Sequence, residues 1–201
     1  MSPNETSAAA RAMLKEASRI LSSPEQDLSY SAIQGEFTWM KSGEIVWIRR
    51  PDFRSVLFWV RSGHQPTVLN QEKRLENVSF LLNEMLGRLP GNLGATDLAA
   101  ALRKLTTDPR GFVASQAFLA TVRPYRSVWT LGDVQLEHLL ESHCPDPVLQ
   151  LRNDGKWNLE FQYFNPMGGV EAWTAKGSST RVITLDRSVA VADGTFRFPF
   201  R

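Results

Sequence analysis

Short apolar runs separated by glycine-containing turns fill the last third of the chain, and this pattern constrains the fold more than any other. The turns include Asn153-Asp154-Gly155, Met167-Gly168-Gly169, Lys176-Gly177 and Asp193-Gly194. Connections this short join strands that run in opposite directions, so the pattern predicts an antiparallel meander. The expected strands are 148–151, 157–164, 170–175, 181–185, 189–192 and 196–200.

Leucine-rich stripes at helical spacing replace this alternation in the middle of the chain. They predict helices at 70–89, 97–105, 109–121 and 133–141, with a short strand at 127–130. Thr96 is the expected N-cap of the helix at 97–105. Pro109 is expected to start the next helix, because a proline at the first helical position loses no hydrogen bond that the helix could have made.

The first third combines one amphipathic helix with strands. Apolar residues repeat at three and four over 7–22, and Ser23-Pro24 is expected to end that helix. A strand that carries Phe37 and Trp39 then precedes strands at 45–48 and 55–61. Five apolar residues in a row in the last of these indicate a strand that is covered on both faces.

These elements together predict an α+β fold, in which an antiparallel and curved sheet has helices packed on one face. No linker or repeat interrupts the chain, so we expect a single domain over 1–201. Its parts would be an N-terminal helix and hairpin at 7–64, a helical middle at 70–142 and a C-terminal meander at 147–200.

Charge and cysteine content restrict the setting of the protein. Lys and Arg number 23 against 21 Asp and Glu, a balance that demands neither nucleic acid nor an anionic membrane as a partner. The single cysteine, Cys144, cannot form an internal disulfide, which fits a reducing compartment. The start of the chain lacks a signal-peptide pattern, and no apolar run approaches the roughly 20 residues of a membrane span. We therefore expect a cytoplasmic protein.

Aromatic residues on the expected strands supply the leading functional hypothesis. Tryptophan is large and rigid, carries a polar N–H, and is suited to contacts with a ligand or partner. Aromatic side chains in strands are also ordinary core residues. The residues expected to line a binding cleft are Trp39, Trp47, Trp157, Tyr163 and Trp173.

A second hypothesis is a DNA-binding regulator. The helices expected at 97–105 and 109–121 have the length and the short turn of a helix-turn-helix. The segment 103–126 holds five basic residues against Asp108 alone, a local charge of +4. The second helix has no basic residue where base edges would be read, so nucleic acid is the disfavoured partner. The residues of this alternative are Arg103, Lys104, Arg110 and Arg123.

Motifs for catalysis or metal binding are weak. His138 and His143 are five residues apart, about 140° around a helix, and so do not share a face. No further Cys or His cluster supplies the ligands of a zinc site, and Cys144 next to His143 would need an irregular turn to form a nucleophile pair. We therefore expect no metal and no cofactor, and an enzyme would have to draw its catalytic groups from dispersed positions.

The sequence thus favours a non-catalytic binding protein whose aromatic-lined cleft takes a protein partner or a small apolar ligand. A DNA-binding regulator and an enzyme with dispersed catalytic residues remain as alternatives. An exposed strand at 196–200, whose Pro199 marks it as an edge, would offer a place for pairing between subunits, so a homodimer is left open.

Overall fold

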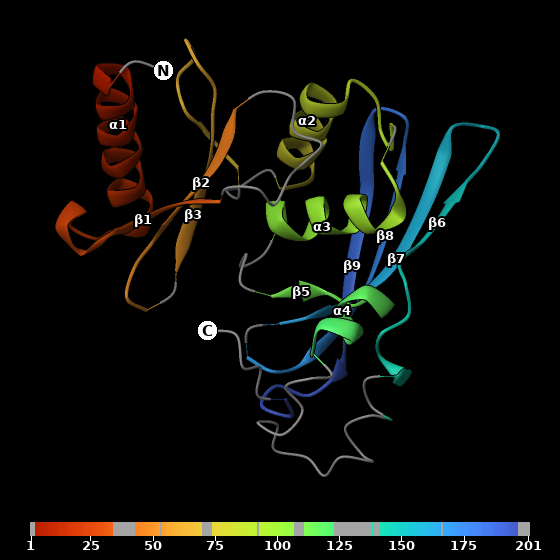
Figure 1. The fold of residues 1–201 in the computed structure, drawn as a ribbon. Coiled ribbons are helices and arrows are strands. Elements are labelled where there is room, and N and C mark those ends of the chain that lie inside the picture. The colour runs from red at the N-terminus through yellow and green to blue at the C-terminus, as the bar shows by residue number, and fades with distance from the viewer. Residues whose placement is uncertain are drawn as a thin grey trace. The chain divides into compact units, whose positions relative to one another are not determined.

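The structure is a computed structural model that describes residues 3–33, 43–52, 54–69, 74–91, 93–106, 111–122, 138, 141–165 and 167–196. It contains α-helices and two antiparallel sheets (Figure 1), so the predicted α+β class is confirmed. The strands lie in two sheets, and the expectation that one curved sheet holds them all is wrong. Two compact units contain these sheets, one at 1–85 and one at 86–201. The expected single domain is not tested by this division and stays a prediction.

The N-terminal unit contains a four-stranded sheet in the order β1-β2-β3-β4. Its strands are β1 (Ser29–Ile33), β2 (Glu44–Arg49), β3 (Ser55–Val60) and β4 (Thr67–Val68), each antiparallel to its neighbour. The strands expected at 45–48 and 55–61 are confirmed as β2 and β3. The sequence did not indicate β1, and the strand expected around Phe37 and Trp39 falls outside the described residues.

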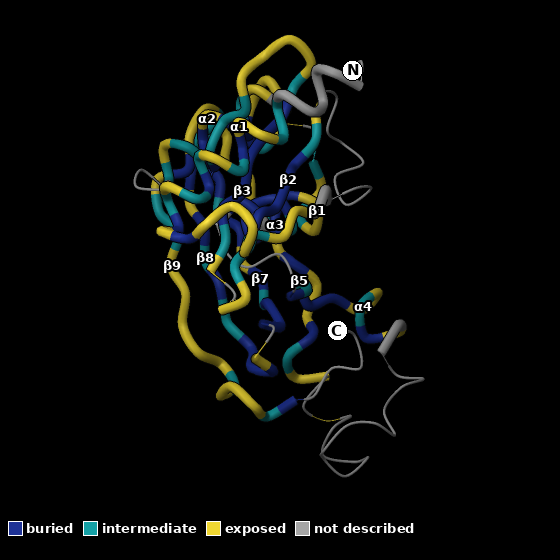
Figure 2. The backbone as a smooth tube through the Cα atoms, turned by 90° about the vertical axis from the view of Figure 1, so that its left-hand side faces the viewer, coloured by how far each residue is buried: buried dark blue, intermediate teal, exposed yellow. Residues whose placement is uncertain are grey.

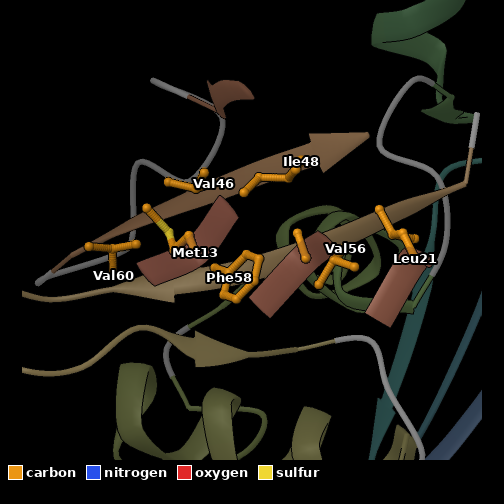
Figure 3. Packing of buried hydrophobic residues seen from close by; sticks show 8 residues of the cluster. Met13, Leu21, Val46, Ile48, Val56, Phe58 and Val60 are labelled. Carbon is orange, nitrogen blue, oxygen red and sulfur yellow. The ribbon is translucent and has the colours of Figure 1, made fainter. Parts of the chain in front are cut away.

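Helix α1 (Pro3–Leu21) covers one face of this sheet, and the helix expected at 7–22 is confirmed with an earlier start. Met13, Ala17 and Leu21 recur every four residues and therefore lie along one side of the helix. Figure 3 shows this side packed against apolar residues of β2 and β3. The helix ends where Ser22 adopts a positive φ of 48° and the Ser23 N–H donates to Ser18 O at 3.1 Å, a Schellman-type end. The strand residues in this contact are Val46, Ile48, Val56, Phe58 and Val60.

The opposite face of the sheet is buried as well, and Figure 2 shows β2 and β3 largely in dark blue. Ile45 pairs with Trp59, and Trp47 pairs with Leu57, on the side away from α1. All four are 9% exposed or less, which confirms a strand that is covered on both faces.

Helix α2 (Arg74–Leu86) lies within the stretch 70–89 that is expected to be helical, and Gly87 with a φ of +70° ends it.

The C-terminal unit contains the second sheet, in the order β5-β7-β8-β9, with β6 also paired to β7. Its strands are β5 (Phe112–Val113), β6 (Val148–Leu151), β7 (Lys156–Phe164), β8 (Val170–Ser178) and β9 (Arg181–Val191). All pairs are antiparallel, so the predicted meander is confirmed from β6 onward.

Two expected breaks in this meander are wrong. Gly177 lies inside β8 rather than in a turn, and it pairs with Trp157 of β7. A glycine fits this position because the Trp157 ring occupies the space that a Cβ would need. The runs expected at 181–185 and 189–192 form one strand, β9, whose exposed middle residues, Asp186 to Ser188, still pair with β8. Polar residues on an exposed strand resemble a turn in the sequence. The backbone pairing with β8 shows that these residues continue the strand.

Helix α3 (Ala95–Thr106) confirms the helix expected at 97–105, although Thr96 is not its N-cap. The Leu98 N–H donates to Gly94 O at 3.0 Å, so the helix starts one turn before Leu98. Leu98, Leu102 and Leu105 are fully buried.

The helix expected at 109–121 is wrong. Phe112 and Val113 form β5 and pair with Phe164 and Tyr163 of β7. Helix α4 (Gln116–Val122) starts only after Ser115, whose Oγ accepts from the Phe118 N–H at 3.1 Å. The aromatic strand contacts and the Ser115 cap therefore outweigh the start signal of Pro109.

Several expected elements lie outside the described residues. They are the strand at 127–130, most of the helix at 133–141 and the strand at 196–200 apart from Phe196. Of the helices in the described part of the chain, none combines the length and the apolar character that crossing a membrane requires.

Candidate functional site

Strands β7 and β8 place a row of aromatic side chains on one face of the C-terminal sheet. Trp157, Phe161 and Tyr163 alternate with polar residues along β7, and the register sets Trp173 opposite Phe161. The rings of Phe161 and Trp173 stack with centroids 5.7 Å apart, and Tyr163 meets Trp173 edge-on at 6.4 Å. Rings in these arrangements hold one another in place.

The polar atoms of this aromatic face already have partners inside the unit. The Trp157 indole N–H donates to Ser178 O at 2.7 Å, and the Trp173 indole N–H donates to Glu171 Oε2 at 2.9 Å. Trp157, Tyr163 and Trp173 are 2%, 1% and 3% exposed. These three predicted binding residues are therefore packed in the C-terminal unit, and their role in lining a cleft stays a prediction.

The other two predicted cleft residues belong to the N-terminal part of the chain. Trp47 is 9% exposed, with the Arg49 guanidinium 4.9 Å from its ring centroid. The Trp47 indole N–H is buried without a hydrogen-bond partner. Trp39 falls outside the described residues. The structure thus brings Tyr163 and Trp173 into contact and sets Trp157 on the same face, and it describes Trp47 only within its own unit.

The basic residues of the nucleic-acid alternative do not form a described surface. Arg103 is 3% exposed, and its guanidinium lies 5.2 Å from the Tyr163 ring centroid, which places it in the core of the unit. Arg110 and Arg123 fall outside the described residues, as does the side chain of Lys104. Since the helix expected at 109–121 is replaced by β5 and α4, the predicted helix-turn-helix is wrong.

A second basic group, Arg49, Arg50 and Arg54 around the β2–β3 turn, has one acidic partner in the described part of the chain, Asp52. Asp52 accepts from Arg54 at 3.0 Å and lies 3.3 Å from Arg50. The guanidinium of Arg54 beside it lowers the pKa of the Asp52 carboxyl below its ordinary value. Arg49 donates to Ser29 Oγ at 3.0 Å. The turn holds three arginines and one carboxylate, so it keeps a net positive charge, and exposed ion pairs of this kind contribute little to stability.

Cys144 lies in an apolar cluster with Phe164, Val170 and Phe196 and is fully buried. Burial raises the pKa of its thiol to about 12, so it is protonated at neutral pH and is a poor nucleophile. Within the described residues, no three His, Cys, Asp or Glu side chains converge as metal ligands would.

Large apolar side chains on the edge strands and in one turn of the C-terminal sheet are exposed to solvent. We call five of them the perimeter residues: Val148 and Leu151 on β6, Met167 in the β7–β8 turn, and Ile183 and Val189 on β9. They are 50%, 64%, 67%, 45% and 75% exposed, respectively. Sequence reasoning missed this surface, because exposed valines and leucines in a strand look the same as buried ones.

Hydrogen bonds hold the turn that presents Met167. Asn165 Oδ1 accepts from the Met167 N–H at 2.9 Å and from the Gly169 N–H at 3.0 Å. The Asn165 side-chain amide also donates to Asp193 Oδ1 at 2.8 Å. The Gly194 N–H donates to Met167 O at 2.8 Å and closes the turn against the chain that follows β9.

Strand β9 is the longest strand of the sheet, and its second half is the most open. Residues 186–190 are all exposed, and Figure 2 shows the strand largely in yellow. Arg187 is the cross-strand neighbour of Trp173 and lies 3.9 Å from Glu171, whose side chain is 17% exposed. A cation, a half-buried carboxylate and Val189 therefore lie beside one another where the aromatic face reaches the sheet edge.

Comparison with known proteins gives no relative for this chain: no family model, no curated protein and no solved structure matches it.

Proposed function

We propose that this chain is a non-catalytic binding protein whose partner is another protein, and that the perimeter of the C-terminal sheet is its contact surface. The observation that carries the proposal is the location of the exposed apolar side chains. Of the seven large apolar residues exposed in the described part of the chain, five are perimeter residues, and the other two are Tyr30 and Phe80.

The packing of the sheet supports this proposal. Leu151 and Val189 lie on the aromatic face, opposite Trp157 and Glu171, whereas Val148 lies opposite Glu160 on the other face. The stacked rings of β7 and β8 support the first two, and rigid supports reduce the entropy lost on binding.

Open sheet edges are a liability that proteins commonly blunt with proline, short strands, charged side chains, bulges or a covering element. Strand β9 carries charged residues and two register shifts against β8, but it has 11 residues and no proline. Its regular stretch between the two shifts, residues 184–189, is therefore the part of the edge that a partner could pair with.

The single cysteine supports a reducing compartment for this encounter. Cys144 is a free thiol in the core, and with no second cysteine in the sequence it cannot form an internal disulfide, the bond that an oxidising compartment favours. We therefore propose the cytoplasm as the location.

Site-specific photocrosslinking in the natural host tests the proposal. A photoreactive phenylalanine analogue replaces Leu151 or Val189 in turn, and Phe80, 52% exposed on α2, is the matched control position. We expect one discrete protein adduct from positions 151 and 189 and none from position 80. Adducts from position 80 alone, or a small apolar molecule retained in native mass spectrometry with no adduct at the perimeter, would overturn a protein partner at this surface.

A further inference from the structure

The alternation of backbone hydrogen bonds along the strands of the C-terminal sheet identifies which N–H and C=O groups of β9 face away from β8. In an antiparallel pair, alternate residues direct both backbone groups toward the same neighbour. The Asn165 N–H donates to Gly169 O at 3.0 Å, next to the β7–β8 ladder, so odd-numbered residues of β7 bond to β8. Gln162 O instead accepts from the Ala114 N–H at 2.8 Å, on the β5 side.

The same alternation extends through β8 to β9. Odd-numbered residues of β8 bond to β7, so Ala172 and Thr174 direct their backbone groups to β9, where their partners are Ser188 and Asp186. The register has no bulge between these pairs. The backbone N–H and C=O of Leu185, Arg187 and Val189 therefore point away from the sheet. In the described part of the chain, no strand pairs with that side of β9.

The side chains of those three residues lie on the aromatic face. Leu185, Arg187 and Val189 are the partners of Ala175, Trp173 and Glu171, which in turn face Leu159, Phe161 and Tyr163 of β7. A strand added along the free edge would place every second one of its side chains beside Leu185, Arg187 or Val189, which are apolar, cationic and apolar in turn. On the other face its neighbours would be Asp186 and Ser188.

We propose that β9 binds an extended segment of a partner protein by strand addition, and that the segment reads apolar, any residue, acidic, basic, apolar from its N-terminus. In the antiparallel direction these five residues lie opposite Val189, Ser188, Arg187, Asp186 and Leu185. Opposite charges across two strands stabilise a pair and like charges destabilise it, so Arg187 selects the acidic residue and Asp186 the basic one. This inference rests on the proposed function, because it names the partner's chemistry at the same sheet.

A second copy of this chain fits the edge less well. Antiparallel pairing about a two-fold axis sets one residue opposite its own copy. Asp186 is the middle residue of β9, so the register with the fullest overlap places Asp186 opposite Asp186. A shift of one residue in one direction places Arg187 opposite Arg187, and in the other direction it places Leu185 opposite Leu185. The first two registers bring like charges together. The third sets Arg187 opposite Ile183 and Asp186 opposite Thr184, so neither charge gains an opposite one, whereas a partner with an acidic and a basic residue pairs both.

A pair of synthetic peptides tests the inference on the full chain. The first is Thr-Val-Thr-Glu-Lys-Val-Thr, capped at both ends, and the second exchanges its Glu and Lys. We follow binding by the amide shifts and the hydrogen exchange of the protein. The first peptide is expected to slow exchange at Leu185, Arg187 and Val189, and the second to bind about tenfold more weakly.

Charge exchange in the protein supplies the matched control. In a variant with both Asp186→Lys and Arg187→Asp, the peptide preference is expected to reverse, which a general loss of folding would not produce. A further variant, Val189→Pro, removes an outward N–H and leaves the bonds to β8, so it is expected to abolish the added protection while the fold persists.

Three outcomes would overturn the inference. The first is that neither peptide protects β9, and the second is that both peptides protect it equally. The third is concentration-dependent protection of the β9 edge without peptide, which makes a second copy the occupant. If crosslinking at Leu151 still yields a protein adduct, the proposed function survives any of these results. Loss of the adducts at positions 151 and 189 contradicts the proposed function itself.

Discussion

Substitution of Gly177 by alanine tests whether Trp157 is a fixed core residue or a movable wall of an open cleft. A Cβ at position 177 would lie inside van der Waals contact of Trp157 Cζ2 and Cε2 and 2.6 Å from Arg181 O. Glycine inside a strand ordinarily costs roughly 0.5–1 kcal/mol relative to alanine, so the substitution would be stabilising if space were available. The overlap with Trp157 is expected to reverse that sign.

The magnitude follows from what Trp157 must give up. Overpacking a buried site costs about 1–3 kcal/mol. Displacing the ring also strains the indole N–H bond to Ser178 O at 2.7 Å, whose loss in a buried site costs about 1–3 kcal/mol. Less the intrinsic gain of alanine, we expect a loss of about 1–5 kcal/mol in the free energy of unfolding. For a chain of this size the melting temperature would fall by about 2–4 °C for each kcal/mol lost.

Chemical denaturation of four proteins measures this effect: the parent, Gly177→Ala, Trp157→Phe and the double variant. Phenylalanine lacks the part of the indole that overlaps the new methyl group. Gly177→Ala should therefore cost at least about 1 kcal/mol less in the Trp157→Phe background than in the parent. A cost below about 0.5 kcal/mol in the parent, or an equal cost in both backgrounds, would refute a fixed Trp157.

Three further predictions concern the core and its titration. Phe58→Ala, in the α1 contact, should lower the free energy of unfolding by about 3–5 kcal/mol, whereas Phe80→Ala, at an exposed position, should change it by less than about 1 kcal/mol. Equal effects of the two substitutions in denaturant melts would contradict the burial of Phe58. Ser115→Ala should cost about 1 kcal/mol through loss of the α4 cap, and an unchanged denaturation midpoint would count against that cap. The pKa of Cys144 is raised to about 12 in the folded chain from an ordinary 9.0, so its contribution to stability is complete below pH 9 and is lost as pH rises toward 12. Cys144→Ala should therefore flatten the decline of stability above pH 9, and an equally steep decline in that variant would refute this source of the pH dependence.

The sequence predicted most accurately those elements that local chemistry alone determines. Strand β6 has the expected bounds, because Asn153-Asp154-Gly155 forms a true turn in which Gly155 takes a φ of +78°. The end of α1 was also predictable, since Pro24 excludes the preceding residue from the helical region. In both places one residue type fixes the backbone without help from distant parts of the chain.

The errors occurred where distant contacts decide the structure. Gly177 reads as a turn residue, but it serves the close approach of Trp157 from the neighbouring strand. Phe112 and Val113 fit a helical stripe equally well, but pairing with Tyr163 and Phe164, some fifty residues later in the chain, makes them a strand.

The candidate site was only partly predictable for the same reason. Aromatic residues at alternate positions indicated a face of the sheet, and the register confirms that Trp157 and Tyr163 share one. The sequence could not show that this face is covered or that β9 is left at the edge. Strand order is a property of the sheet as a whole, and the exposure of Val189 follows from it.

Amide hydrogen exchange along β9 in the free protein tests the open edge most directly. Leu185, Arg187 and Val189 should exchange rapidly, because their N–H groups point to solvent, whereas Thr184, Asp186 and Ser188 should be protected by their bonds to β8. Alternation between fast and slow amides over these six residues is the predicted result. Uniform protection across them would mean that the edge is already paired, and it would contradict β9 as the surface where a partner binds.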